Sequence, residues 1–91
     1  MRMEYDHHLR PRLSWERLSP REKEVALWTI RGYSVREVAS ILHISQRTVK
    51  VHASSIYSTL NIETRSELAY YGMRDRFCTD VSIEQHHLPF G

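Results

Sequence analysis

Apolar residues recur at helical spacing in four short stretches of this chain, residues 20–31, 35–42, 46–60 and a fourth that begins at residue 65. In the longest stretch, the positions at intervals of three and four are Val49, His52, Ile56 and Leu60. Side chains at these intervals share one face of a helix, so this face is predicted to be buried. Gly72 disfavours a helix and leaves the end of the fourth open, either there or near Phe77 and Cys78. The pattern predicts an all-α fold.

Capping sequences mark where these helices begin. Three stretches open with a reciprocal capping box, in Ser19–Glu22, Ser34–Glu37 and Thr64–Glu67. In this box the hydroxyl accepts from the backbone N–H three residues on, and the Glu accepts from the N–H of the first residue. The third helix begins at Ser45 without the acid. Leu42–Ile44 leave only a short turn between the second and third helices, which is the helix-turn-helix layout that places a helix in a DNA groove.

The chain divides into a flexible N-terminal arm over residues 1–18, a helical domain over 19–75 and a flexible C-terminal tail over 76–91. The helical domain holds eight basic and six acidic residues, so it carries the whole net charge of +2. This balance gives weak DNA affinity unless charge is concentrated on one face or two copies act together. No apolar run approaches the roughly 20 residues that span a bilayer, so no membrane role is expected. With no leader at its start, the protein is expected to be cytoplasmic and, on DNA, nucleoid-associated.

Several motifs agree in order and spacing with one family. The residues that carry the agreement are Leu18–Val25, Gly32–Ala39, Leu42–His52, Ile56, Leu60 and Arg65. Over about residues 18–70 the chain closely resembles the LuxR-type DNA-binding domain, also called GerE or FixJ/NarL-type. The resemblance implies a four-helix helix-turn-helix module whose third helix enters the major groove and whose fourth usually supports dimerisation. Because only 18 residues precede the first helix, we expect no sensor domain and a stand-alone regulator, or a modulator of a larger relative.

Three positions depart from the family pattern. Val35 stands where the family commonly has Asn, Thr59 where Lys is common, and Ser54 at a position that is often basic. These departures remove polar or basic groups and leave Arg47 and Lys50 as the main cations of the third helix. A single copy is therefore predicted to bind DNA weakly.

The outer face of the third helix carries the candidate base contacts. A Lys can reach guanine O6 or N7 and a Val can touch a thymine methyl, so Lys50 and Val51 are predicted to read bases. The flanking base-reading candidates are Gln46, Arg47 and Ser54. The candidates for DNA phosphate contacts, at or near helix starts, are Ser34, Arg36, Ser45 and Thr48. The alternatives are a solvated helix face for the first set, and simple capping or a solvated arginine for the second.

The fourth helix offers a candidate dimerisation surface, formed by Leu68, Ala69, Tyr70 and Tyr71. These residues provide more apolar area than one short helix is expected to bury in its own core. A two-fold contact there would set two recognition helices about one DNA turn apart. We therefore predict a homodimer on a roughly palindromic site in double-stranded DNA. The alternative is a protein-interaction modulator that pairs with a larger LuxR-type regulator or with RNA polymerase and alters its action.

Three further apolar residues lie off the predicted buried faces, namely Leu27, Val35 and Ile41. Isolated exposed apolar residues are normal in soluble proteins. The alternative is that the arm or the tail folds over them, and the apolar residues available for this are Leu13, Trp15, Phe77 and Ile83.

Catalysis, a metal site and a cofactor are not predicted. His52 lies on the buried stripe and is expected to be a packed, hydrogen-bonded core histidine. The adjacent pairs His7–His8 and His86–His87 lack a fixed third ligand. The single Cys78 lacks the spacing of a zinc site. The helical domain is also too small for a convincing catalytic cleft, so the protein is not expected to be an enzyme.

Overall fold

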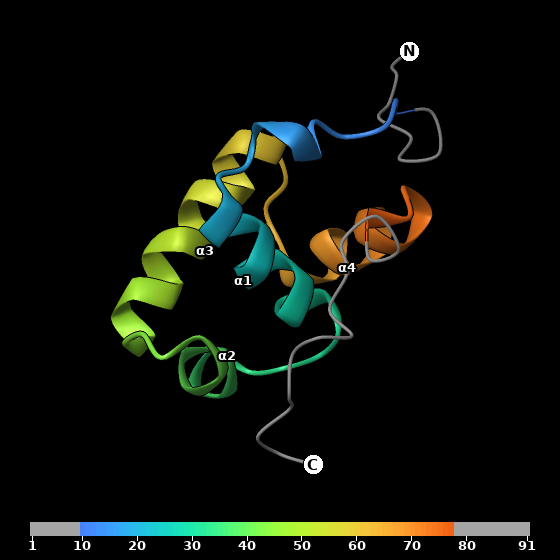
Figure 1. Ribbon diagram of the computed structural model, residues 1–91. Coiled ribbons are helices and arrows are strands. Elements are labelled where there is room, and N and C mark those ends of the chain that lie inside the picture. The colour runs from blue at the N-terminus through green and yellow to red at the C-terminus, as the bar shows by residue number, and fades with distance from the viewer. Residues whose placement is uncertain (1–9, 78–91) are drawn as a thin grey trace.

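A computed structural model describes residues 10–77, and within them the chain is helical (Figure 1). The elements are the 3-10 helix η2 (Trp15–Arg17) and the α-helices α1 (Pro20–Ile30), α2 (Val35–Leu42), α3 (Gln46–Leu60) and α4 (Arg65–Arg74). The predicted all-α fold is confirmed. α2 and α3 have the predicted bounds, α1 ends one residue earlier than predicted, and α4 continues past Gly72.

The three predicted capping boxes are present at the starts of α1, α2 and α4. In α1, the Glu22 N–H donates to Ser19 Oγ at 3.1 Å and the Ser19 N–H donates to Glu22 Oε1 at 2.9 Å. α3 begins differently, because the Thr48 N–H donates to Ser45 Oγ at 3.0 Å and no acid lies in its first turn. Each cap satisfies a backbone N–H that has no partner inside the helix, which is why local sequence determines these starts.

A tight turn of three residues, His43–Ser45, separates α2 from α3. His43 has a left-handed backbone with φ 59°, and the Ile44 N–H donates to the Ala39 carbonyl at 3.0 Å. These features close the end of α2 and redirect the chain, so that α3 packs against α2. The predicted helix-turn-helix arrangement is therefore formed by α2 and α3.

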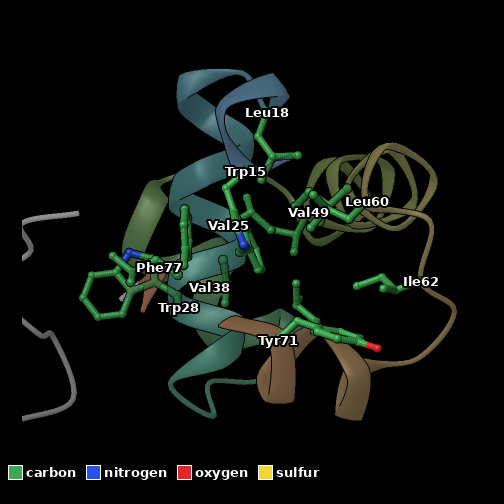
Figure 2. Close-up of a cluster of buried hydrophobic side chains, with 14 of the residues drawn as sticks. Trp15, Leu18, Val25, Trp28, Val38, Val49, Leu60, Ile62, Tyr71 and Phe77 are labelled. Carbon is green, nitrogen blue, oxygen red and sulfur yellow. The ribbon is translucent and has the colours of Figure 1, made fainter. Parts of the chain in front are cut away.

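The helix α1 lies in the middle of the fold, between α3 on one side and α4 on the other (Figure 1). α2 packs against both α1 and α3, whereas α3 and α4 share few direct contacts. The buried side chains between the helices include Val25, Trp28, Val38, Val49, Leu60 and Tyr71 (Figure 2). The placement of α3 relative to α4 consequently depends on the other parts of the protein against which each of them packs.

Gly72 is a packing residue rather than a helix end. α4 runs through it to Arg74, and its Cα faces Ile30 of α1. A Cβ at this position would overlap the Ile30 side chain. The glycine therefore lets α1 and α4 approach closely, and this tertiary contact outweighs its low helix propensity.

The prediction of a flexible arm through residue 18 is wrong for residues 10–18. Leu13, Trp15 and Leu18 are each at most 6% exposed and belong to the same buried cluster as Leu27, which is 1% exposed. The alternative that the arm supplies apolar cover is therefore confirmed for Leu13 and Trp15. The arm packs on the helices because these side chains bury apolar area that the four helices alone would leave in water.

The predicted tail also contributes to the core at its first residues. Phe77 is 2% exposed, and its ring stacks on Trp15 with centroids 4.4 Å apart and planes 19° from parallel. Val35 and Ile41 are half-buried and pack against the cluster. Residues 1–9 and 78–91, with Ile83 among them, lie outside the described residues.

Candidate nucleic-acid interface

The outer face of α3 brings the predicted base-reading residues together. All five are exposed: Gln46, Arg47, Lys50, Val51 and Ser54. On the opposite face, Val49, Ile56 and Leu60 are each at most 2% exposed. Because this inner face is packed in the core, only the outer face of α3 is available to a ligand.

Val51 is an apolar side chain displayed among polar ones on this face. It is 61% exposed, whereas most apolar side chains of the described residues are buried or half-buried. Arg47 and Ser54 lie one turn before and after Lys50 and Val51, so the four side chains share one helix face. An apolar contact between hydrogen-bond donors suits the edges of base pairs in the major groove, where methyl groups lie beside acceptors.

The charge of α3 favours an anionic ligand. None of its 15 residues is acidic, while Arg47 and Lys50 lie in its first two turns. The third position of α1, α2 and α4 is a capping Glu, but the same position of α3 is Thr48, whose hydroxyl lies 2.8 Å from Ser45 Oγ. The first turn of α3 itself therefore has no carboxylate to offset the positive end of the helix dipole.

The predicted phosphate-contacting residues lie at the starts of α2 and α3. Ser34 and Ser45 are exposed and each accepts a capping hydrogen bond, from the Glu37 and Thr48 N–H groups at 3.1 and 3.0 Å. Thr48 is half-buried and Arg36 is exposed. An open depression at the start of α2 is lined by Ser34, Arg36, Glu37 and Ser40. The capping role is thus confirmed for Ser34 and Ser45, and a phosphate contact by any of the four predicted residues stays a prediction.

An arginine of α4 holds Tyr33, the residue before the Ser34 cap of α2, and this role was not predicted from the sequence. Arg65 Nη2 donates to the Tyr33 carbonyl at 2.6 Å. The Tyr33 ring meets Trp28 edge-on, with centroids 5.4 Å apart. Through these contacts, α4 and α1 fix the position of the start of the helix-turn-helix. The hydrogen bond joins residues 32 positions apart, so no local pattern could reveal it.

His52 is half-buried, which corrects the expectation of a core histidine. It lies near Glu22 of α1, which packs against α3. The hydrogen bond from the Ser19 N–H, then that from the Ser55 hydroxyl, lower the pKa of Glu22, and the nearby His52 adds to this effect. His52 therefore belongs to the contact between these helices, away from the outer face of α3.

The proposed dimerisation surface of α4 is only partly exposed. Leu68 and Tyr71 are 2% and 0% exposed, so the expectation that this helix has more apolar area than it can bury in its own core is wrong for these two residues. α4 packs against α1, and the Arg10 guanidinium lies over the Tyr71 ring, so both residues belong to the buried cluster. Tyr70 is 41% exposed and Ala69 half-buried. Met73, at 71% exposed, was missed, although its position three residues after Tyr70 places both on one face.

Within residues 10–77 the protein has neither a metal-binding cluster nor a membrane-spanning helix. No group of three or more His, Cys, Asp or Glu there is placed to hold a metal ion. The histidine pairs and Cys78 lie outside this range. Among the described helices, none has the length and apolar character needed to cross a bilayer.

Comparisons with known proteins agree with this geometry. A family model described as "Bacterial regulatory proteins, luxR family" matches residues 16–71, which include α1, α2, α3 and most of α4. Over 60 residues the chain is 40% identical to the response regulator protein VraR of Staphylococcus aureus strain Mu3, and equally to VraR of Staphylococcus saprophyticus and Staphylococcus epidermidis. The aligned region is 66% of this chain and 29% of each relative, so the chain spans less than a third of their length.

The buried face of α3, the tight turn before it and the family match over the same helices lead to one assignment. The module is a helix-turn-helix DNA-binding domain of transcriptional regulators, and the family is not enzymatic. This chain therefore belongs to the luxR family of bacterial regulatory proteins.

Proposed function

We propose that this protein regulates transcription by binding a roughly palindromic DNA site as a homodimer, with α3 of each copy in the major groove. The observation that carries the proposal is the outer face of α3, which is exposed, free of acidic residues and opposite a fully packed face. Such a face can enter a groove without rearrangement of the core. Because its ligand is bacterial DNA, we place the protein at the nucleoid in the cytoplasm.

Base recognition is assigned to the middle of α3. Lys50 donates to guanine O6 or N7, and Val51 contacts a thymine methyl. A Lys that reaches both guanine acceptors discriminates by about 1–3 kcal/mol, and burial of a Val methyl group contributes about 0.8 kcal/mol. The residues proposed to flank them at the base edges are Gln46, Arg47 and Ser54. The residues proposed to fix the register by contacting phosphates are Ser34, Arg36, Ser45 and Thr48.

Dimerisation is proposed because one copy offers few cations and because α4 displays an apolar patch. The net charge is only +2, so two copies are needed to bring enough basic residues to one site. Tyr70 and Met73, with Ala69 beside them, form the exposed face of α4. Since α4 and α3 lie on different sides of α1, a two-fold contact through α4 leaves both α3 helices facing outward (Figure 1).

Selection from random DNA duplexes tests this function. Purified protein is incubated with the pool at near-physiological salt, and the bound fraction is sequenced for the wild type, for Lys50→Ala and for Lys23→Ala. The last variant is the matched control, because it removes the same side chain from α1. We expect a two-fold motif for the wild type and the control, with base preferences weakened in Lys50→Ala.

Other results of the selection would contradict the proposal. Folded wild-type protein that enriches no sequence would exclude specific DNA reading and favour a protein-interaction modulator, which pairs with a larger regulator or polymerase through Tyr70 and Met73. A monomer bound to one half-site would exclude the homodimer.

A further inference from the structure

The end of α4 is tied to the segment 10–18, which includes η2, by a buried carboxylate. Asp75, whose side chain is 3% exposed, accepts through Oδ2 from the Leu13 N–H and from Trp15 Nε1–H, both at 2.9 Å. Its Oδ1 accepts from Arg74 Nε at 2.8 Å. We call Arg10, Leu13, Trp15, Arg74 and Asp75 the N-terminal clasp. Its polar groups pair with one another, as buried charges require.

Arg74 also binds the first described residues of the chain. Its Nη1 donates to the Arg10 carbonyl and its Nη2 to the Pro11 carbonyl, both at 3.0 Å. The guanidinium groups of Arg74 and Arg10 lie over the buried Tyr71 ring, 4.7 and 5.0 Å from its centroid. The segment that begins at Arg10 is thus held both through its backbone carbonyls and through the Arg10 side chain.

Arginine 10 also joins the clasp to α3. Its Nη2 and Nη1 donate to the carbonyls of Leu60 and Asn61, at 3.2 and 3.3 Å. These carbonyls lie at the C-terminal end of α3, where a helix has unpaired acceptors and the negative end of its dipole. A guanidinium satisfies both requirements, so Arg10 acts as a cap that a distant segment supplies.

This link matters because α3 and α4 share few direct contacts and both pack on α1. Along the chain they are joined by the short loop 61–64. A bridge from the α3 carbonyls through Arg10 to Arg74 and Asp75 fixes the far end of α3 against the far end of α4. In a dimer formed through α4, the angle between α3 and α4 in each copy determines how far apart the two α3 helices lie.

We propose that the N-terminal clasp sets the half-site spacing that this protein reads, with Arg10 as a positioning residue for α3. The inference rests on the proposed dimeric DNA binding. It assigns to residues 10–15 a part in DNA recognition, although they lie outside the helix-turn-helix and need not touch DNA.

The test measures binding to palindromic duplexes that share one half-site sequence, taken from the selection, and differ in spacer length by one base pair at a time. Wild-type protein, Arg10→Gln and Arg17→Gln are compared. Arg17→Gln is the matched control, because Arg17 is exposed in the same segment and its replacement removes the same charge. Thermal unfolding followed by circular dichroism verifies that each variant is folded.

We expect the wild type and Arg17→Gln to prefer one spacer sharply. Arg10→Gln should lose about threefold or more of that preference while it keeps the same half-site sequence. If Arg10→Gln does not fold, Arg10→Lys takes its place, since it keeps the charge but cannot bridge both carbonyls with a planar fork. An unchanged spacer preference would overturn the proposal, even if overall affinity fell, because a merely structural role predicts a uniform loss.

Amide hydrogen exchange of the free protein separates this inference from the proposed function. Arg10→Gln should exchange faster than Arg17→Gln in the last turn of α3. If wild-type protein selects no DNA yet this difference is seen, dimeric DNA binding fails and the positioning of α3 by the clasp stands. Equal exchange in the two variants would overturn the positioning of α3 itself.

Discussion

The helices α3 and α4 flank the same central helix but use their charged side chains in opposite ways. On α3, Arg47 and Lys50 are exposed on a face without acids. At the end of α4, Arg74 and Asp75 are drawn into the N-terminal clasp, and the carboxylate is 3% exposed. Cations that stay hydrated remain available to a ligand, whereas paired and buried charges fix the position of neighbouring elements. The comparison separates the groups that we expect to affect DNA binding from those that we expect to affect folding and geometry.

The largest effect on stability is expected for Asp75→Asn. This change removes the charge that compensates Arg74 and places an amide against two donors, which should lower the free energy of unfolding by about 3 kcal/mol. Glu16→Gln is the control, because Glu16 and Arg12 are exposed and 4.0 Å apart, and such pairs contribute roughly 0–1 kcal/mol. Urea unfolding at neutral pH measures both. Equal stability of the two variants would contradict the role given to the clasp.

The helix starts and the clasp differ in how far sequence could predict them. Ser19, Ser34 and Thr64 form caps with residues three positions away, so their boxes were readable directly. Arg10 contacts residues about 50 positions away, and Asp75 contacts residues 60 and 62 positions away. Such contacts exist only once the tertiary fold has formed. A polar segment before the first helix therefore looked like a flexible arm.

In the candidate site, too, the features set by local sequence were predictable and those set by distant contacts were not. The outer face of α3 followed from the periodicity of its buried residues, because a helix with a packed face must present the opposite one. The error on Leu68 and Tyr71 arose because α4 packs against α1 and because Arg10 lies over the Tyr71 ring, and no periodicity within α4 predicts such contacts.

The second largest effect is expected on DNA affinity, for Lys50→Ala and Val51→Ala. Lys50→Ala should weaken binding to the selected site by about 1–3 kcal/mol, because a base contact is lost. Val51→Ala should weaken it by about 1–2 kcal/mol, because two methyl groups are removed from the contact with the thymine methyl. Each should change the free energy of unfolding by less than about 0.5 kcal/mol, since both side chains are exposed. Fluorescence anisotropy and urea unfolding of the same preparations measure the two quantities. A stability loss as large as that of Asp75→Asn would contradict the proposed division between α3 and the clasp.

A smaller effect is expected for Met73→Glu on the exposed face of α4. A charge placed in a self-complementary contact meets its own copy, so dimerisation should weaken by about tenfold or more. Glu63→Gln, at an exposed position before α4, is a control for the general effect of charge. Sedimentation equilibrium reports the monomer–dimer balance. Unchanged association of Met73→Glu would exclude this face as the dimer contact.

The smallest effect is a pH dependence confined to acid conditions. Burial opposes ionisation of Asp75, but the hydrogen bonds from Leu13, Trp15 and Arg74 outweigh it and hold the pKa below its ordinary value of 3.8. A lowered pKa stabilises the folded state fully above the unfolded value, and this contribution is lost as pH falls through the folded one. The stability difference between wild type and Asp75→Asn should stay constant from about pH 8 to 5 and shrink below about pH 4. If this stability difference changed near pH 6 instead, a group other than Asp75 would control the pH dependence.

The most direct test of the central claim, that the outer face of α3 reads DNA while the clasp only positions it, is a titration of 15N-labelled protein with the selected duplex, followed by NMR. We expect the largest amide shifts along residues 46–54 and at the Ser34 and Ser45 caps, with much smaller shifts at Arg74 and Asp75. Largest shifts at the clasp or along α4, with α3 unaffected, would contradict the account.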